Sequence, residues 1–388
     1  MEARRSGPLS GMRIVELGGI GPVPFAGMYF ADLGAEVLRI DRQQGGFDMP
    51  IDPRFDTLQR GKQRITVDLK HPGGAQALLC LVEQSDVLLD SYRPGVLERL
   101  GVGPQVCLER NPRLVIGRMT GWGQEGPLAQ RAGHDPTYLA HTGALHAIGR
   151  AGGPPQLPLS LVGDFGGGAM YLISGVLAAL WEAGRSGQGQ VVDAAIVDGV
   201  SHLMASPYSL FNGGAWTDER GTNLIDSGAP FVDVYETSDS RHMVVAALEP
   251  QFYAQLLDGL GLAVADLPRQ WDQDGWPQLR ETFTAVFGSR TRDEWTAVFE
   301  DTDACVAPVL SMAEAPRSAH LAARGTFIER DGHHEPAPAP RFSRTTPGEP
   351  PAPSAPYEIP AAQALGAWGA ADPDAVLATG AVLDRVRV

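Results

Sequence analysis

The chain has 388 residues, 43% of them hydrophobic, which is enough to bury a large core and leads us to expect two domains. Its formal net charge of −15 argues against a general nucleic-acid-binding protein. The start "MEARRSGPLSG" lacks a following apolar segment, and no apolar run approaches the length of a bilayer span, so we expect neither secretion nor a membrane segment.

The first third of the chain alternates predicted strands with predicted helices. This alternation indicates an α/β protein with a mostly parallel, doubly wound sheet, which would bind ligands at the carboxyl ends of its strands. The predicted elements are the strand Met12–Leu17, the helix Pro24–Gly34, the strand Ala35–Asp41, a helix over about 74–84, the strand Val87–Leu89 and a strand within "RLVIGRMTGWG".

A glycine cluster and a long apolar segment follow in "GDFGGGAMYLISGVLAALWEAGRSGQGQ". The pattern predicts a helix that starts at the glycines and ends before Gly184. Because this helix is apolar nearly all round, we expect it to be buried, within the core or between subunits. The segment "VVDAAI" after it predicts one more strand of the sheet.

The second half of the chain predicts a smaller domain. Residues 201–225 read as a linker, and two strands around Asp239-Ser240 with a helix beginning near Pro250 open an α+β domain over 226–319. Residues 1–200 and 320–388 are assigned to the large domain. Within the latter, the proline-rich stretch from Glu335 to Pro360 predicts an extended connection over the surface.

The cysteines and histidines do not indicate a metal site. Cys80, Cys107 and Cys305 lack zinc or redox spacing and suit reduced thiols in the cytosol, so we expect a cytoplasmic protein. His134 is followed by two further histidines, but no carboxylate or cysteine completes a ligand set and no H-E-x-x-H motif is present.

The basic residues are concentrated in the first third of the chain. Residues 1–131 contain 16 Lys and Arg against 15 Asp and Glu, whereas the rest contains 15 against 31. A basic region in an acidic protein indicates where an anionic ligand would bind. Grouped arginines and lysines can hold several phosphates, although any one of them could equally belong to a solvated charged face. The candidates are Arg42, Arg60, Lys62, Arg64, Arg93 and Arg99.

The segment "LGGIGPVPFAG" after the first strand invites a dinucleotide-binding interpretation, which fails. Pro24 stands where the third glycine of G-x-G-x-x-G belongs, and Pro22 and Pro24 remove backbone donors that a pyrophosphate needs. Asp41 could bind a ribose, but the adjacent Arg42 suits a phosphate. We therefore expect an anionic ligand other than a nicotinamide cofactor.

Three acidic or histidine positions have both an ordinary and a catalytic interpretation. Asp164 in "LVGDFGGG" could cap a helix, and the glycines after it would expose N–H groups to a developing oxyanion. His134 in "GHDP" could simply precede a helix, and Glu249 in "LEPQFY" could interact with a helix N-terminus or orient a histidine.

Taken together, these segments resemble the family III CoA-transferase superfamily and, within it, the α-methylacyl-CoA racemases. The resemblance runs from about residue 8 to 345 and is carried by a combination of motifs. These are "PLSGMRIVELGGIGPVPFAGMYFADLGAEVLRIDR", "RGKQRITVDLK", "DSYRPGVLERLG", "MTGWGQEGPLAQRAGHDPTY", "LVGDFGGGAMYLISGVLAALWE" and "GQVVDAAIVDG".

The resemblance implies roles for particular residues. Asp164 matches an aspartate shared across the superfamily, His134 matches a histidine that the racemases have, and Glu249 matches an acid that hydrogen-bonds this histidine. Residues implied to contact coenzyme A are Arg42, Arg60, Lys62, Tyr92, Arg93, Arg99 and Asp135, the last through its backbone. The resemblance also implies a large Rossmann-like CoA-binding domain, a small domain and an interlocked homodimer.

The implied reaction inverts the α-carbon of a 2-methylacyl-CoA thioester. Inversion needs a base on each face, and His134 and Asp164 would remove and return the proton, with backbone N–H groups near Asp135 and after Asp164 stabilising the enolate. Coenzyme A would be part of the substrate, and no other cofactor is expected. In the alternative, a CoA-transferase, Asp164 would attack an acyl-CoA and carry CoA to another carboxylic acid.

Met28, Tyr138, Met170 and Tyr208 could line the acyl site or belong to the core.

Overall fold

The computed structural model describes residues 6–43, 50–353, 359–369 and 372–383. The chain divides into two compact units, each with its own core. The first unit consists of residues 1–142, 159–203 and 327–388, and the second of residues 143–158 and 204–326. Residues 143–158, which we had assigned to the large domain, and the predicted linker after residue 203 therefore belong to the second unit.

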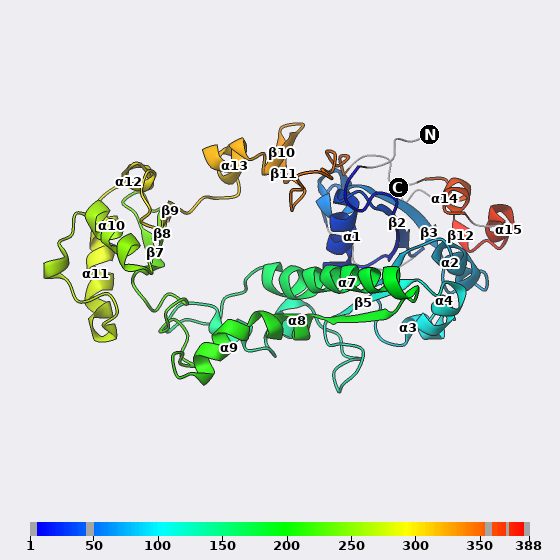
Figure 1. The fold of residues 1–388 in the computed structure, drawn as a ribbon, viewed down its shortest axis with the longest axis horizontal. Helices are drawn as coiled ribbons and strands as arrows, with labels where there is room; N and C mark the ends of the chain where they lie inside the picture. The colour runs from blue at the N-terminus through cyan, green and yellow to red at the C-terminus, as the bar shows by residue number, and fades with distance from the viewer. Residues whose placement is uncertain (1–5, 44–49, 354–358, 370–371, 384–388) are drawn as a thin grey trace. The chain divides into compact units, whose positions relative to one another are not determined.

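A seven-stranded sheet with the order β12-β3-β2-β1-β4-β5-β6 forms the centre of the first unit (Figure 1). All neighbouring pairs are parallel except β12 with β3, which is antiparallel. The predicted doubly wound parallel sheet is thus confirmed. The strands are β1 Arg13–Leu17, β2 Glu36–Asp41, β3 Lys62–Val67, β4 Val87–Asp90, β5 Val115–Thr120, β6 Val191–Ala195 and β12 Val382–Leu383.

Helices cover both faces of this sheet, because each strand buries side chains on its two sides. On one face, strand residues such as Val15 and Ile116 join a core with Leu78, Cys107 and Leu365 from three helices. On the other face lie α1 and α7. The helices named here are α1 Pro22–Asp32, α2 Gly74–Val82, α4 Pro104–Arg110, α7 Met170–Ser186 and α14 Ala361–Ala367.

The long apolar helix begins earlier than the sequence predicted. It begins with nine π-helical residues, Leu161–Ala169 (η3), and continues as α7 to Ser186, so the glycines lie inside the helix and do not open it. Within the single chain it is only partly buried: α7 packs on β5 and β6, but Trp181 is 74% exposed. Of the two expected locations, the core therefore accounts for one face of the helix, and burial between subunits stays a prediction.

The same helical stretch, Leu161–Ser186, is long and apolar enough to cross a membrane by length and composition, contrary to our reading of the sequence. It is the one helix of this kind in the part of the chain that the structure describes. The observation is weak evidence, because buried core helices meet the same criterion.

The second unit has an α+β core built on a three-stranded antiparallel sheet, β7-β8-β9. Its strands pack against aromatic side chains of α10, α11 and α12, including Phe283 and Trp295. The β7–β8 hairpin turns at Ser240, where the sequence predicted a turn. Ser240 has a positive φ. The elements are α9 Ala205–Asn212, β7 Val232–Glu236, β8 His242–Ala246, α10 Pro250–Leu260, α11 Trp276–Phe287, α12 Arg292–Phe299, β9 Val306–Pro308 and α13 Ala319–Ala323.

The remaining helices and strands of the first unit are mostly short. The hairpin β10–β11 and the terminal helix α15 follow the second unit in sequence. These elements are α3 Val96–Arg99, α5 Asp135–Leu139, α6 Ala144–Ala147 (which lies in the second unit), α8 Ile196–Leu203, β10 Phe327–Arg330, β11 His333–Pro336 and α15 Pro373–Ala378. The predicted extended connection is confirmed for residues 337–353, which contain no helix or strand.

Candidate functional site

A pocket of about 370 Å³ opens in the first unit at the carboxyl ends of β1, β2, β4 and β5. This position includes the point between β1 and β4 where the strand order reverses, which is where doubly wound sheets bind ligands. The segment after β1 (residues 18–20, 22 and 23), the end of β2 (residues 39, 41 and 42), the loop after β4 (residues 91–94) and residues 119–122 after β5 line it. The remaining lining comes from residues 129 and 131–134 and from Tyr138, Asp164 and Ile196.

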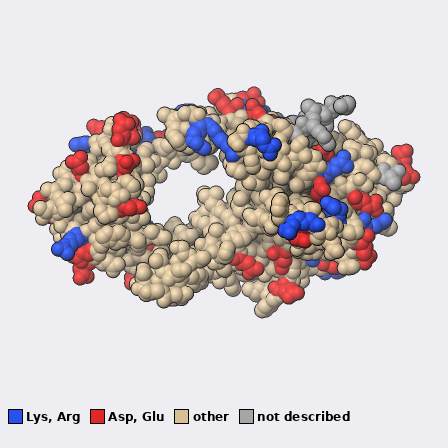
Figure 2. All heavy atoms as spheres, viewed as in Figure 1, with Lys and Arg blue, Asp and Glu red and all other residues tan. Residues whose placement is uncertain are grey.

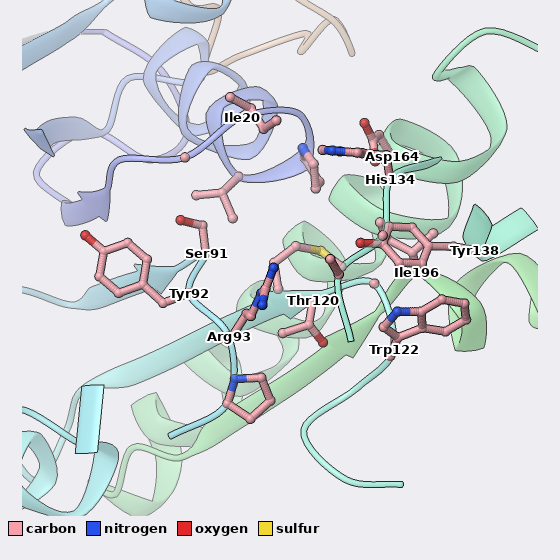
Figure 3. Close-up of a pocket in the computed structure, with 18 of the residues that line it drawn as sticks. Ile20, Ser91, Tyr92, Arg93, Thr120, Trp122, His134, Tyr138, Asp164 and Ile196 are labelled. Carbon is pink, nitrogen blue, oxygen red and sulfur yellow. The ribbon is translucent and has the colours of Figure 1, made fainter. Parts of the chain in front are cut away.

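His134 and Asp164 lie together on one side of this pocket (Figure 3). His134 is the N-cap of α5, and its backbone N–H donates to Thr137 Oγ1 at 3.0 Å, which fixes the start of that helix. Asp164 comes from η3 and is half-buried, and its charge interacts with His134. The structure thus brings two of the three predicted catalytic residues into one cavity.

The first turn of α1 closes the pocket beside Asp164. A Cβ placed on Gly21 would lie 2.8 Å from Asp164 Oδ2, and Gly21 has φ of 69°, so glycine is required there on two grounds. In dinucleotide-binding proteins this helix N-terminus receives a pyrophosphate. Here the protein's own carboxylate occupies the position, which gives a structural reason for rejecting the nicotinamide interpretation.

Burial and, to a smaller extent, the negative charge of Asp135 raise the pKa of Asp164 to about 6, while His134 acts in the opposite direction. A helix N-terminus would normally favour the carboxylate anion. Here Pro22 and Pro24 contribute no N–H, and the N–H of Phe25 donates to the Gly21 carbonyl. The helix end therefore offers few donors, and desolvation of Asp164 dominates.

Asp135 contributes its side chain as well as the backbone that we had expected. Its carboxylate is 5% exposed, and its Oδ2 accepts a hydrogen bond from the N–H of Asp164 at 2.7 Å. The N–H of Gly163 also donates to this carboxylate. Asp135 itself does not line the pocket. Its side chain instead supports the backbone of Asp164 from the protein interior.

The glycine cluster after Asp164 does not form the oxyanion hole that the sequence suggested. The N–H of Asp164 donates to Asp135, and the N–H of Phe165 donates to the Ser160 carbonyl at 3.0 Å. The glycines instead permit close helix packing, since a Cβ on Gly167 would lie 2.5 Å from Val200 of α8. Their role is steric because neighbouring backbones leave no room for side chains.

Exposed cations also line the pocket that holds His134 and Asp164. The Arg42 guanidinium lies 4.3 Å from the centre of the Tyr92 ring, and Tyr92 is itself only 5% exposed. Tyr92 is held by its N–H, which donates to Asp90 Oδ1 at 2.8 Å. Arg93 and Arg131 also line the pocket, and both are exposed. This cavity can therefore accept an anionic group beside a carboxylate and an imidazole.

Arg60 and Lys62, which we expected to contact phosphates, are placed elsewhere. Arg60 forms a buried ion pair with Asp32, with Nη2 2.7 Å from Oδ2, and neither cation lines the pocket. Lys62 Nζ lies 2.7 Å from Glu16 Oε2 and donates to the Pro24 carbonyl. The prediction assumed that both residues lie at or beyond the end of a strand. Lys62 instead begins β3, and Arg60 precedes it.

Two further predicted residues lie outside the pocket lining. Arg99 is exposed on α3, with Nη1 close to Gly95, and its contact with coenzyme A remains a prediction. Glu249 is the N-cap of α10 in the second unit, where its side chain is exposed. Its hydrogen bond to His134 likewise remains a prediction.

Sequence reasoning missed several lining residues, including Arg131 and Trp122. Trp122 follows β5 directly, so the rule that ligands bind at strand ends could have identified it. Its ring packs against Tyr138 at a centroid distance of 4.9 Å. Of the four candidates for the acyl site, Tyr138 alone lines this pocket. Among the described residues, no cluster of three or more His, Cys, Asp or Glu side chains could hold a metal ion.

An ion-pair network at the end of β2 belongs to the pocket lining. Figure 2 shows basic and acidic side chains interspersed on the face that it presents. Arg39 and Asp41 both line the pocket; Arg39 pairs with Glu16 and Asp41, and Arg64 also pairs with Asp41. Although burial opposes ionisation, these arginines lower the pKa of Asp41. Asp41 is therefore held at the pocket as an ion-paired carboxylate.

Fold and site together define an α/β protein with a pocket at the switch point of a parallel sheet, lined by arginines and by His134 and Asp164. The family model for CoA-transferase family III matches residues 9–359. This protein belongs to that family.

Similar proteins include both racemases and transferases. The chain is 44% identical to the alpha-methylacyl-CoA racemase of Mus musculus over 339 residues, which cover 87% of each chain. It is 43% identical to the Homo sapiens alpha-methylacyl-CoA racemase over 333 residues, or 85% of this chain and 86% of that one. A succinyl-CoA–D-citramalate CoA-transferase of Chloroflexus aurantiacus is 30% identical over 343 residues, or 85% and 84%.

Solved structures agree in fold. A CAIB/BAIF family protein from Brucella suis superposes with a TM-score of 0.75 at 24% identity, covering 89% of this chain and 95% of that one. A hypothetical protein from Mycobacterium tuberculosis gives a TM-score of 0.73 at 26% identity, covering 88% and 96%. These likenesses confirm the expected fold class.

Proposed function

We propose that this protein is a racemase that interconverts the (2R) and (2S) epimers of 2-methylacyl-CoA thioesters. The observation that carries the proposal is the joint presence of His134 and Asp164 in a pocket that is also lined by Arg42 and Arg93. The relatives named alpha-methylacyl-CoA racemase are the second support.

The reaction needs one base on each face of the substrate α-carbon. Neutral His134 would take the proton from one epimer while protonated Asp164 returns a proton to the other face, and the roles would exchange in the reverse direction. Each positioned base typically contributes about 10²–10⁴ in rate. Since burial raises the pKa of Asp164 to about 6, this carboxyl can exist as acid and as base near neutral pH.

The enolate intermediate requires hydrogen-bond donors at the thioester oxygen. The donors after Asp164 are occupied, so the backbone N–H of Asp135, the first residue of α5, is the candidate that remains from our predictions. Losing one such donor typically costs about 3 kcal/mol of transition-state stabilisation. The proposed steps move protons only, and coenzyme A enters as part of the substrate.

The CoA phosphates would bind the exposed cations of the pocket. Arg42, supported by Tyr92, and Arg93 are the predicted residues that line it, and Arg131 joins them. Arg99 remains a proposed contact outside this lining. We also propose that Glu249 orients His134 by a hydrogen bond, as the family resemblance implies.

The alternative is a CoA-transferase in which the Asp164 carboxylate attacks an acyl-CoA to form an anhydride and then an aspartyl-CoA thioester. The transferase of Chloroflexus aurantiacus is one relative that supports it. One observation favours the racemase: His134 lines the pocket together with Asp164 and has no part in the transferase scheme.

One experiment separates the two reactions. The protein is incubated with a single epimer of a 2-methylacyl-CoA in D₂O, and α-deuterium incorporation and epimer ratio are followed together. We expect deuterium incorporation with epimerisation. Transfer of CoA to an added carboxylic acid without either change would overturn the proposal in favour of the transferase.

We further propose a cytoplasmic homodimer that acts in lipid metabolism and binds neither nucleic acid nor membrane. Cys80, Cys107 and Cys305 are free thiols, in keeping with a reducing compartment. Large apolar side chains such as Trp181 on α7 are exposed in the single chain, and a second copy could cover them. Light scattering on the purified protein tests the dimer, which a monomeric mass would contradict.

A further inference from the structure

A buried carboxylate that the two-base scheme does not use lies behind the catalytic pair. The side chain of Asp135 is 5% exposed and does not line the pocket. It accepts hydrogen bonds from the N–H groups of Asp164, at 2.7 Å, and of Gly163. Both donors belong to the turn of η3 that carries the catalytic carboxyl.

The fit between this carboxylate and the turn is close. A Cβ placed on Gly163 would lie 2.0 Å from Asp135 Oδ2, so a side chain at 163 would displace one of the two. Asp135 also follows His134 directly in sequence and is the first residue of α5. A single residue therefore links the element that carries His134 to the element that carries Asp164.

We propose that Asp135 is a positioning residue for this acid–base pair, and that its carboxylate sets both the placement of the Asp164 turn relative to His134 and the charge that Asp164 experiences. The inference rests on the proposed function, in which these two residues share the proton transfers. It adds a role for the side chain of Asp135 to the backbone role already proposed.

The electrostatic part of this role has a definite sign. Burial is the first cause of the raised pKa of Asp164, and the like charge of Asp135 is the second. Removing the charge at 135 therefore lowers the pKa of Asp164. The charge of His134 lowers the pKa of Asp164. Tyr138 and Arg93 are the other charged or titratable neighbours: burial raises the pKa of Tyr138, Asp164 raises it further, and Arg93 lowers it.

Other elements packed against η3 also carry titratable groups, but none of them is among the charges that shift the pKa of Asp164. These described groups are Tyr29 and Asp32 on α1, Arg118 on β5, Tyr171, Glu182 and Arg185 on α7, Asp193 on β6, and Asp198 and His202 on α8. Asp198 is exposed and makes a matched control.

The test compares Asp135→Asn, Asp135→Ala and the control Asp198→Asn with the parent protein. Asparagine keeps an acceptor oxygen without the charge, whereas alanine removes both. For Asp135→Asn, starting from the epimer whose proton the Asp164 carboxylate removes, we expect the acidic limb of the kcat/KM profile for epimerisation to move down by about 1 pH unit. For Asp135→Ala we expect the same movement and a fall in kcat of about 10- to 100-fold, because two backbone donors lose their acceptor. Asp198→Asn should change neither.

A second measurement keeps the proposal independent of the reaction. The Asp164 carboxyl is titrated by ¹³C NMR in protein with labelled aspartate, its signal being the one that Asp164→Asn lacks. A lower Asp164 pKa in Asp135→Asn supports the proposal even if the parent protein fails to epimerise, an outcome that would defeat the proposed function alone. Variants that fold, as judged by circular dichroism, and leave both the acidic limb and the Asp164 titration unchanged would overturn the positioning role.

Discussion

Lys62 Nζ lies 2.7 Å from Glu16 Oε2, and both side chains are fully shielded from solvent. The pair joins the start of β3 to β1, and the hydrogen bond from Lys62 to the Pro24 carbonyl extends it to α1. Burial lowers the pKa of Lys62 to about 8, which Glu16 opposes. Lys62 is therefore a structural cation beneath the pocket.

Replacing this lysine should destabilise the protein. Lys62→Met leaves Glu16 with one buried charge partner fewer, and we expect a loss of about 3–5 kcal/mol in the free energy of unfolding. Urea or guanidinium unfolding measures it. The control is Lys70→Met, which alters the other lysine of the chain, an exposed one, and should leave stability unchanged. Equal stability of the two variants would show that the Lys62–Glu16 pair contributes nothing.

Replacing a pocket cation should weaken substrate binding and leave stability nearly unchanged. Arg42→Ala removes a guanidinium that stands over Tyr92 at the pocket and has no structural ion pair among the described residues. We expect KM for the CoA thioester to rise about 10-fold with little change in unfolding, and the effect to shrink at high salt. Arg185→Ala, at the exposed end of α7, serves as the control. A fall in kcat with constant KM would contradict phosphate binding by Arg42.

The raised pKa of Asp164 predicts a cost to stability that depends on pH. A carboxyl whose folded-state pKa is about 6, well above that of an aspartate in an unfolded chain, binds more protons in the folded than in the unfolded state between these two values. Stability therefore falls as pH rises through this window. Asp164→Asn removes the charge, and we expect it to be more stable than the parent by about 1–3 kcal/mol at pH 7.5.

Thermal or denaturant unfolding at pH 4 and pH 7.5 checks this expectation. The difference should shrink towards pH 4, where the folded parent is already protonated at Asp164. Epimerisation should be lost in the same variant. A stability difference independent of pH would mean that burial of the Asp164 charge is not its cause.

The contact between Gly21 and Asp164 can be tested with a matched glycine. Gly21 and Gly101 have φ of 69° and 75°, so alanine is strained by about 1 kcal/mol or more at either position. A Cβ meets Asp164 Oδ2 at 2.8 Å in the first case and nothing within 4 Å in the second. We expect kcat for epimerisation to fall about 10-fold in Gly21→Ala and to stay constant in Gly101→Ala. Similar kcat values for the two would exclude a steric role of Gly21 at the site.

Much of the fold and part of the site could be predicted locally. The apolar runs around Val15, Val37 and Leu88 mark strands, their alternation with helices predicts a parallel sheet, and "GHDP" does start a helix at Asp135. Membership of a known family supplied the pairing of His134 with Asp164. Arg60 and Lys62 were misplaced because β3 was not recognised, and residue type alone does not distinguish a phosphate ligand from one half of a buried ion pair.

The sequence by itself determined the α/β class, the two-unit organisation and the chemical groups available. These follow from strands, helices and turns, and each such element depends on the pattern of a few neighbouring residues. The tertiary structure decided which of these groups meet. The sheet brings Lys62 of β3 to Glu16 of β1, although β2 lies between these strands. Helix packing brings Asp135 onto the backbone of Asp164, and the prolines of α1 leave that carboxyl with few donors. Such contacts depend on residues far apart in the chain, and the desolvation that raises the pKa of Asp164 exists only once they are packed.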